Sequence, residues 1–175
     1  MKLLVSLCAV LAVLGAPAAH AQQAEDAEVT ITSQMELPAD AVWKHAFDAY
    51  EGAAGEENAV LLRALAFMNA MAAEGVAPER VKVAVVVHGP AVFDVTGDAR
   101  YGAKYQGEDG QALRNPNYNN VAELVARGAE IWVCGVAAKH HKVGNMHLLE
   151  GVKMAPSATV AHAELQRRGF GLNPF

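Results

Sequence analysis

A short run of β-branched residues constrains the fold of this chain more than any other feature. Residues 81–87 read VKVAVVV and follow Pro78 closely. Valine is enriched in strands, and a run with almost no polar residues is typical of a strand buried on both faces. Such strands belong to parallel sheets that are covered by helices on both sides. We therefore expect this run to be a strand inside an α/β domain.

Helical and strand-like segments alternate around this run. The clearest helix is predicted at residues 57–74, where leucines and methionines recur at helical spacing before a glycine. Further strands are predicted at 42–50, 130–136 and 151–154, with a final extended piece at 171–175, and further helices at 120–127 and 157–168. Alternation at this spacing favours a parallel sheet. The predicted fold class is α/β, a three-layer α/β/α sandwich with a mainly parallel sheet of about five strands.

One long segment has neither pattern. Residues 97–120 are rich in glycine and polar side chains and include Pro116, which predicts a surface loop. Asn120 and Glu123 stand three residues apart where the next helix should begin, a spacing typical of a capping box. We expect Asn120 to cap that helix and Gly128 to end it.

The first 21 residues have the pattern of a secretory signal peptide. Lys2 precedes an apolar run over residues 3–14, and AHA at 19–21 is a small-x-small cleavage site. An apolar segment of about a dozen residues is too short to span a bilayer of about 30 Å. We expect cleavage near Ala21, no stable membrane anchor, and a periplasmic or secreted protein.

Composition excludes several other classes of protein. The chain is 53% AVILMFWYC and 19% charged, with a formal net charge of −5, so it is too apolar for a disordered tail and not basic enough to bind nucleic acid through phosphates. The organisation expected is a signal peptide (1–21), an N-terminal arm (22–41) and one α/β domain (42–175). Cys8 leaves with the signal, so Cys134 becomes the lone thiol, and no disulfide can form within the mature chain.

Candidate chemistry lies where strands end, because loops and helix N-termini converge at the carboxyl edge of a parallel sheet. Three predicted strand ends carry chemically capable groups or adjoining glycines: Asp48 with Tyr50, His88 with Gly89, and Cys134 with Gly135. The sequence does not say which of these strands are neighbours.

Cys134 is the strongest candidate, and His88 is a second candidate site residue. A thiol at a strand end, followed closely by Lys139, His140 and Lys142, meets conditions that favour the nucleophilic thiolate. The alternative is a core residue, because cysteine is among the most buried residue types. His88 is suited to donating or accepting a proton, or to capping its strand.

No metal or cofactor is expected. His140, His141 and His147, with Met146 and Met154 nearby, offer copper or zinc ligands, but their spacing matches no recognised site. The chain has no complete phosphate loop, no dinucleotide fingerprint, no HExxH and no G-x-S-x-G.

Four segments taken together resemble the DsrE/DsrF-like family, in its exported branch. They are VKVAVVVHGP at 81–90, the block at 120–135 that closes with ARGAEIWVCG, LLEGV at 148–152, and LQRRGF at 165–170. The resemblance implies a three-layer α/β fold, homo-oligomers (trimers or hexamers), and a cysteine that carries sulfur as a persulfide between partner proteins. Cys134 matches the family's cysteine, and His88 matches a recurrent histidine of the exported branch.

Three functions are consistent with these residues. The first is a sulfur carrier or sulfurtransferase in which Cys134 takes sulfur from a donor and hands it to an acceptor protein. The second is a non-catalytic oligomeric subunit that binds a small ligand and packs the cysteine in its core. The third is a redox sensor in which the thiol forms a sulfenic acid or a mixed disulfide.

Overall fold

The computed structural model describes residues 31–38 and 40–173. Two compact units divide the chain at Glu36 and Leu37. The predicted signal peptide and half of the predicted arm lie outside the described residues, and residues 31–38 contain no helix or strand. Within the part of the chain that is described, no helix combines the length and apolar character needed to cross a bilayer.

A five-stranded parallel sheet forms the centre of the second unit. Its strands are β1 (Trp43–Ala49), β2 (Val81–Val87), β3 (Glu130–Cys134), β4 (Val152–Ala155) and β5 (Gly171–Asn173). They are ordered β4-β3-β2-β1-β5, and every neighbouring pair is parallel. The valine-rich run is therefore the central strand, which confirms the predicted α/β fold with five strands.

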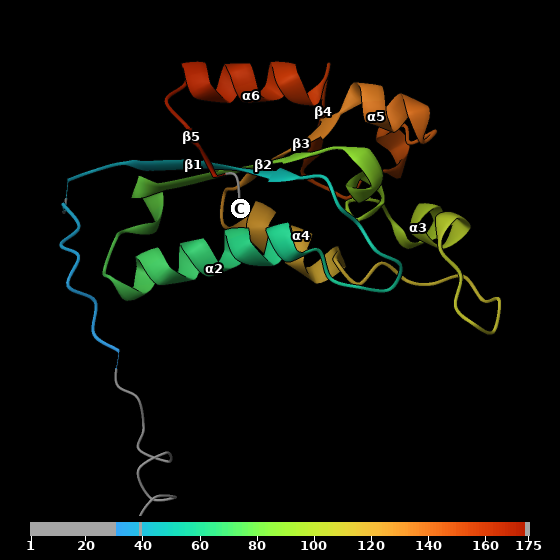
Figure 1. Cartoon of the computed structure of the whole chain (residues 1–175), viewed down its shortest axis with the longest axis horizontal. Coiled ribbons are helices and arrows are strands. Elements are labelled where there is room, and N and C mark those ends of the chain that lie inside the picture. The colour runs from blue at the N-terminus through green and yellow to red at the C-terminus, as the bar shows by residue number, and fades with distance from the viewer. Residues whose placement is uncertain (1–30, 39, 174–175) are drawn as a thin grey trace, which may run out of the picture. The chain divides into compact units, whose positions relative to one another are not determined.

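Helices cover both faces of this sheet (Figure 1). They are α2 (Ala59–Ala73), α3 (Asp98–Lys104), α4 (Tyr118–Ala126), α5 (Gly135–His140) and α6 (Ala158–Arg167), with short 3-10 helices at Pro78–Arg80, Gly89–Phe93 and Asn145–His147. Helices α2 and α4 lie on one face of the sheet, and α6 lies on the other.

The two faces of the sheet bury cores of different size. Alternate residues of β2, such as Val83 and Val85, point into the larger core with Leu61 of α2. The intervening residues, such as Val86, point into a smaller core that α6 closes with Leu165. Because both faces are covered, the central strand reads as a continuous apolar run instead of an alternating one.

Local sequence explains where the main helices begin and end. The side chain of Asn58 accepts hydrogen bonds from the first backbone amides of α2, and Gly75, with a φ of 77°, follows the end of that helix. Ser157 caps α6 by accepting a hydrogen bond from the amide of Val160 at 3.1 Å. These caps satisfy backbone donors that a helix leaves free at its start.

Two predictions within the segment 97–128 are wrong. The expected loop contains α3, and α4 begins at Tyr118 instead of behind an Asn120 cap. Asn120 lies inside α4, where its amide donates a hydrogen bond to the carboxylate of Glu57 at 2.8 Å. The third strand also ends two residues earlier than predicted, because Gly135 already begins α5.

Candidate functional site

Three strand ends that carry candidate residues are neighbours at the carboxyl edge of the sheet. In the order β3-β2-β1, Val133 pairs with Val87, and Val87 pairs with Ala49. The next residues along β3 and β2 are Cys134 and His88. The structure therefore brings the predicted site residues to adjacent positions, a placement that the sequence left open.

Asp48 is hydrogen-bonded by two histidines. Its Oδ2 lies 3.0 Å from Nε2 of His88, directly after β2, and its Oδ1 lies 2.6 Å from Nε2 of His162, in α6. All three side chains are partly exposed, with His162 the least exposed at 17%. We call Asp48, His88 and His162 the His–Asp–His cluster.

The cluster keeps its carboxylate ionised. Burial by itself would raise the pKa of Asp48, but hydrogen bonds and charge from His88 and His162 outweigh it and hold the pKa below its ordinary value. An ionised carboxylate only accepts hydrogen bonds, so each histidine donates its Nε2–H to Asp48. The carboxylate thereby selects the tautomer of both rings.

Tyr50 packs against this cluster because of the glycine that follows His88. The rings of Tyr50 and His88 have centroids 5.1 Å apart. Gly89 has a φ of 56°, and a Cβ at this position would lie 2.5 Å from Cε2 of Tyr50. Only glycine allows both the backbone turn and the close approach of the tyrosine ring.

Cys134 occupies the junction between β3 and α5. It is a free thiol, 6% exposed, and its Sγ accepts a hydrogen bond from the backbone amide of Ala137 at 3.5 Å. Its sulfur makes no hydrogen bond to His88, which is engaged with Asp48 instead. The two predicted site residues therefore lie at adjacent strand ends without a direct bond between them.

Two of the histidines considered for a metal site make other contacts. His147 Nδ1 accepts a hydrogen bond from the amide of Gly144 at 2.9 Å, and the ring of His141 packs edge-on against Phe93. Burial, followed by the positive charges near it, lowers the pKa of His141. Among the described residues, no three histidine, cysteine, aspartate or glutamate side chains are grouped to hold a metal ion.

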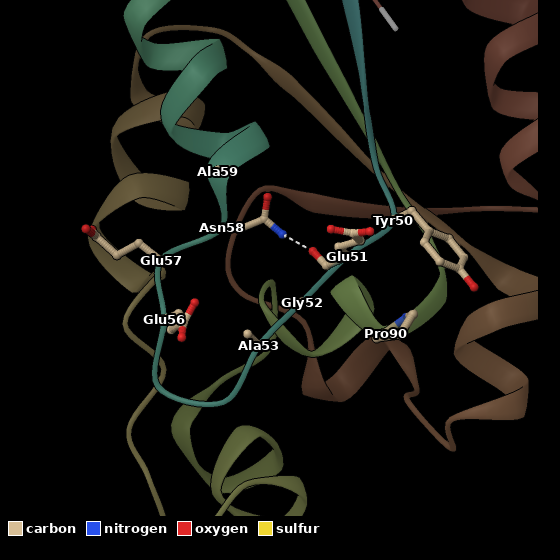
Figure 2. A pocket seen from close by; sticks show the side chains of 9 residues that line it. All are labelled: Tyr50, Glu51, Gly52, Ala53, Glu56, Glu57, Asn58, Ala59 and Pro90. Atoms are coloured by element: carbon tan, nitrogen blue, oxygen red, sulfur yellow. Dashed lines mark hydrogen bonds between the residues drawn. The ribbon is translucent and has the colours of Figure 1, made fainter. Parts of the chain in front are cut away.

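A hollow of about 400 Å³ lies beside the strand ends, between β1 and the start of α2 (Figure 2). Its lining includes three glutamates, Glu51, Glu56 and Glu57, together with Tyr50 and Pro90. In Figure 2 the amide of Asn58 donates a hydrogen bond to the backbone carbonyl of Glu51, which fixes the loop that forms the wall.

Behind this wall lies a fully buried carboxyl group. Asp94 Oδ2 accepts a hydrogen bond from Asn58 Nδ2 at 2.7 Å, while its Oδ1 has no partner. Burial raises the pKa of Asp94 to about 7, although the hydrogen bond from Asn58 opposes the rise. Gly52 permits this packing, because a Cβ there would lie 2.8 Å from the carboxylate.

Sequence reasoning missed His162 and Asp94. A signal for His162 was present, because it stands four residues after Ala158 and beside Ala161, on the side of α6 that packs on the sheet. No local signal marks Asp94, whose burial results from packing between loops that are distant in the chain.

Comparisons with known proteins agree with the fold. The chain resembles the solved structure of a protein of unknown function, MTH1491, from Methanobacterium thermoautotrophicum, with a TM-score of 0.56 and 20% identity over 76% of this chain and 99% of that one. A second solved structure, the ychN protein from E. coli, is similar with a TM-score of 0.46 and 15% identity, over 77% of this chain and 100% of that one. No curated protein is significantly similar in sequence. A family model matches residues 45–172, and this chain belongs to the DsrE/DsrF-like family.

Proposed function

We propose that this protein is a sulfur carrier that holds sulfur as a persulfide on Cys134 and passes it to an acceptor. The observation that supports it best is the position of Cys134, a free thiol at the carboxyl edge whose Sγ accepts a backbone N–H. The thiolate is the nucleophilic form of cysteine, and its sulfur can accept such a hydrogen bond. Family membership agrees with this chemistry, because Cys134 lies within the matched residues 45–172 and its sequence context resembles that of the family's cysteine.

Loading of the carrier can be written with thiosulfate as the donor. The Cys134 thiolate attacks the outer sulfur of thiosulfate, the S–S bond of the donor breaks, and sulfite leaves with the electron pair. The product is a persulfide on Cys134, and no external oxidant or reductant is consumed. The transferable sulfur then lies about 2 Å beyond Sγ. That extension places the reactive atom beyond the sulfur of a side chain that is 6% exposed.

Intact mass measurement tests this proposal. The full chain is incubated in turn with thiosulfate and polysulfide, freed of donor, and measured without reductant. We expect a gain of one sulfur atom in Cys8→Ser, whose only thiol is Cys134, and no gain in the double variant Cys8→Ser/Cys134→Ser. Absence of the gain with every donor, or its persistence in the folded double variant, would overturn the proposal.

The low exposure of Cys134 favours a second candidate, a non-catalytic oligomeric subunit that binds a small ligand. In that function the thiol only packs in the core, and a ligand would bind in the hollow beside the strand ends. Cys134→Ser would then leave ligand binding and oligomeric state unchanged. Redox sensing differs from both, because peroxide would produce a sulfenic acid or a mixed disulfide identifiable by mass.

We also propose that the carrier works outside the cytoplasm as a homo-oligomer. The pattern of residues 1–21 supports export, and membership of the family supports assembly. Light scattering on the purified protein should give the mass of a trimer or a hexamer. A monomer at micromolar concentration would contradict the proposed assembly.

A further inference from the structure

Both oxygens of Asp48 are occupied by imidazoles that come from different elements. His88 follows β2 and approaches Oδ2, while His162 lies in α6 and approaches Oδ1. The carboxylate cannot rotate without losing one of these hydrogen bonds. Asp48 therefore fixes the orientation of both rings as well as their tautomer.

This arrangement leaves one nitrogen of each ring available. Because Nε2 of both rings donates to Asp48, a neutral ring carries its lone pair on Nδ1. No described residue hydrogen-bonds Nδ1 of His88 or of His162, and neither atom is one of the buried unpaired nitrogens. Each neutral ring therefore presents a proton acceptor on a partly exposed surface.

Of the two histidines, His88 is the one whose backbone position lies next to that of Cys134. Val87 and Val133 are paired, so His88 and Cys134 follow at adjacent strand ends. The sulfur nevertheless takes its hydrogen bond from Ala137 and makes none to His88. The imidazole is thus not used to hold the thiol and is left for a molecule that approaches it.

We propose that His88 is the general base that accepts the proton of an incoming acceptor thiol when Cys134 passes its sulfur on, and that Asp48 and His162 position it. This inference rests on the proposed sulfur-carrier function. The partner it identifies is a thiol, either a small molecule or a cysteine of another protein, because only a group with a removable proton needs the base.

The transfer step balances without any further reactant. The proton of the acceptor thiol moves to Nδ1 of His88, and the acceptor sulfur bonds to the outer sulfur of the persulfide. The S–S bond to Cys134 breaks, and Cys134 leaves as a thiolate that keeps the hydrogen bond from Ala137. The acceptor ends as a persulfide, and His88 later releases its proton to water.

Single-turnover discharge separates this role from a structural one. All variants are made on Cys8→Ser, loaded with one sulfur, freed of donor, and mixed with excess glutathione, and the loaded fraction is followed by intact mass across a pH series. We expect His88→Gln to load normally but discharge about 100-fold more slowly near neutral pH. Asp48→Asn and His162→Gln should slow discharge less, and exposed His140→Gln is the matched control that should match the parent.

The dependence of the discharge rate on pH distinguishes a general base from a structural residue. The pH dependence of the rate should differ between the parent and His88→Gln, because in the variant it follows only the ionisation of glutathione. Equal profiles in the parent and in a folded, loaded His88→Gln would overturn the inference while the carrier function stands. Failure of the parent to load would overturn both.

A second measurement tests the positioning role without any sulfur chemistry. Nitrogen-15 NMR of the imidazole rings should show His88 and His162 with the proton on Nε2 in the wild type, and a changed tautomer in at least one ring of Asp48→Asn. Identical ring spectra in the two proteins would refute the positioning by Asp48.

Discussion

Asp94 shows how one buried carboxyl group can set the pH dependence of stability. It is fully buried, has a single hydrogen-bond donor at Oδ2 and leaves Oδ1 without a partner. Burial disfavours the charged form, which is why its pKa rises from 3.8 to about 7. The native state therefore holds a proton that the unfolded chain releases between these two values.

The sign of the resulting pH dependence follows from this difference. The folded-state pKa lies above the unfolded one, so the contribution of Asp94 is fully present below about pH 4 and is lost as the pH rises to about 7. At about 1.4 kcal/mol per pKa unit, the loss above pH 7 amounts to about 4 kcal/mol. We expect Asp94→Asn to raise the free energy of unfolding at about pH 8 and to flatten its dependence on pH, as measured by urea unfolding.

A second aspartate provides a control with the opposite sign. The amide of Asn115 and then the guanidinium of Arg114 hold the pKa of Asp98 below its usual range. Asp98→Asn should therefore lower stability at neutral pH. The explanation for Asp94 would be wrong if Asp94→Asn unfolded at a lower urea concentration than the wild type at about pH 8.

At the residue scale, the sequence pointed to Cys134 and His88 as candidate site residues but not to the hydrogen bonds that join His88 and His162 to Asp48. Cys134 and His88 could be found because each directly follows an apolar run, and the edge of a parallel sheet collects such residues. The bond from His162 to Asp48 joins residues 114 positions apart. No local sequence pattern can predict a contact over that separation, so the His–Asp–His cluster could be found only in the structure.

At the scale of elements, long periodic segments were predicted correctly and the short helix α3 was not. A seven-residue helix that follows Gly97 and contains Gly102 has weak intrinsic propensity. Gly102 is needed there because a Cβ would lie 2.9 Å from the backbone oxygen of Leu113. Tertiary packing therefore requires a glycine inside α3. Because glycine lowers helix propensity, the local sequence does not predict this helix.

The junction of β3 and α5 permits a direct test of such packing. A Cβ at Gly135 would lie 2.7 Å from the backbone oxygen of Ala155 and 3.0 Å from that of Pro156. We expect Gly135→Ala to reduce the free energy of unfolding by about 1–3 kcal/mol, because backbone atoms of the β4 end must shift. Chemical denaturation measures the loss.

Gly171→Ala is the matched control, because its Cβ would meet nothing closer than the oxygen of Lys44 at 3.8 Å. It should change stability little. If Gly135→Ala has the same free energy of unfolding as the wild type, the backbone at the end of β4 can shift at little cost. The junction that holds Cys134 would then be less rigid than the contacts indicate.

At the scale of the whole molecule, the fold class followed from the sequence, but the order of strands did not. Any order of the strands is compatible with the pattern of apolar runs. Burial on both faces explains why each strand is apolar, but it does not determine which strands lie side by side. The order β4-β3-β2-β1-β5 is what makes the strand ends that carry Cys134, His88 and Asp48 neighbours on the carboxyl edge. These three residues could be chosen as candidates from the sequence. Their arrangement as neighbours depends on the strand order, which the sequence does not give.

The last prediction concerns the start of the chain. The described cores are built from residues at or after Leu37. We expect the exported protein to begin at Gln22 by intact mass, and its free energy of unfolding to match that of the full chain within about 0.5 kcal/mol. A protein that keeps Lys2 and stays with the membrane fraction would contradict cleavage. Cleavage would also leave Cys134 as the only thiol, so a sulfur atom gained by the exported protein could then be assigned to that residue alone.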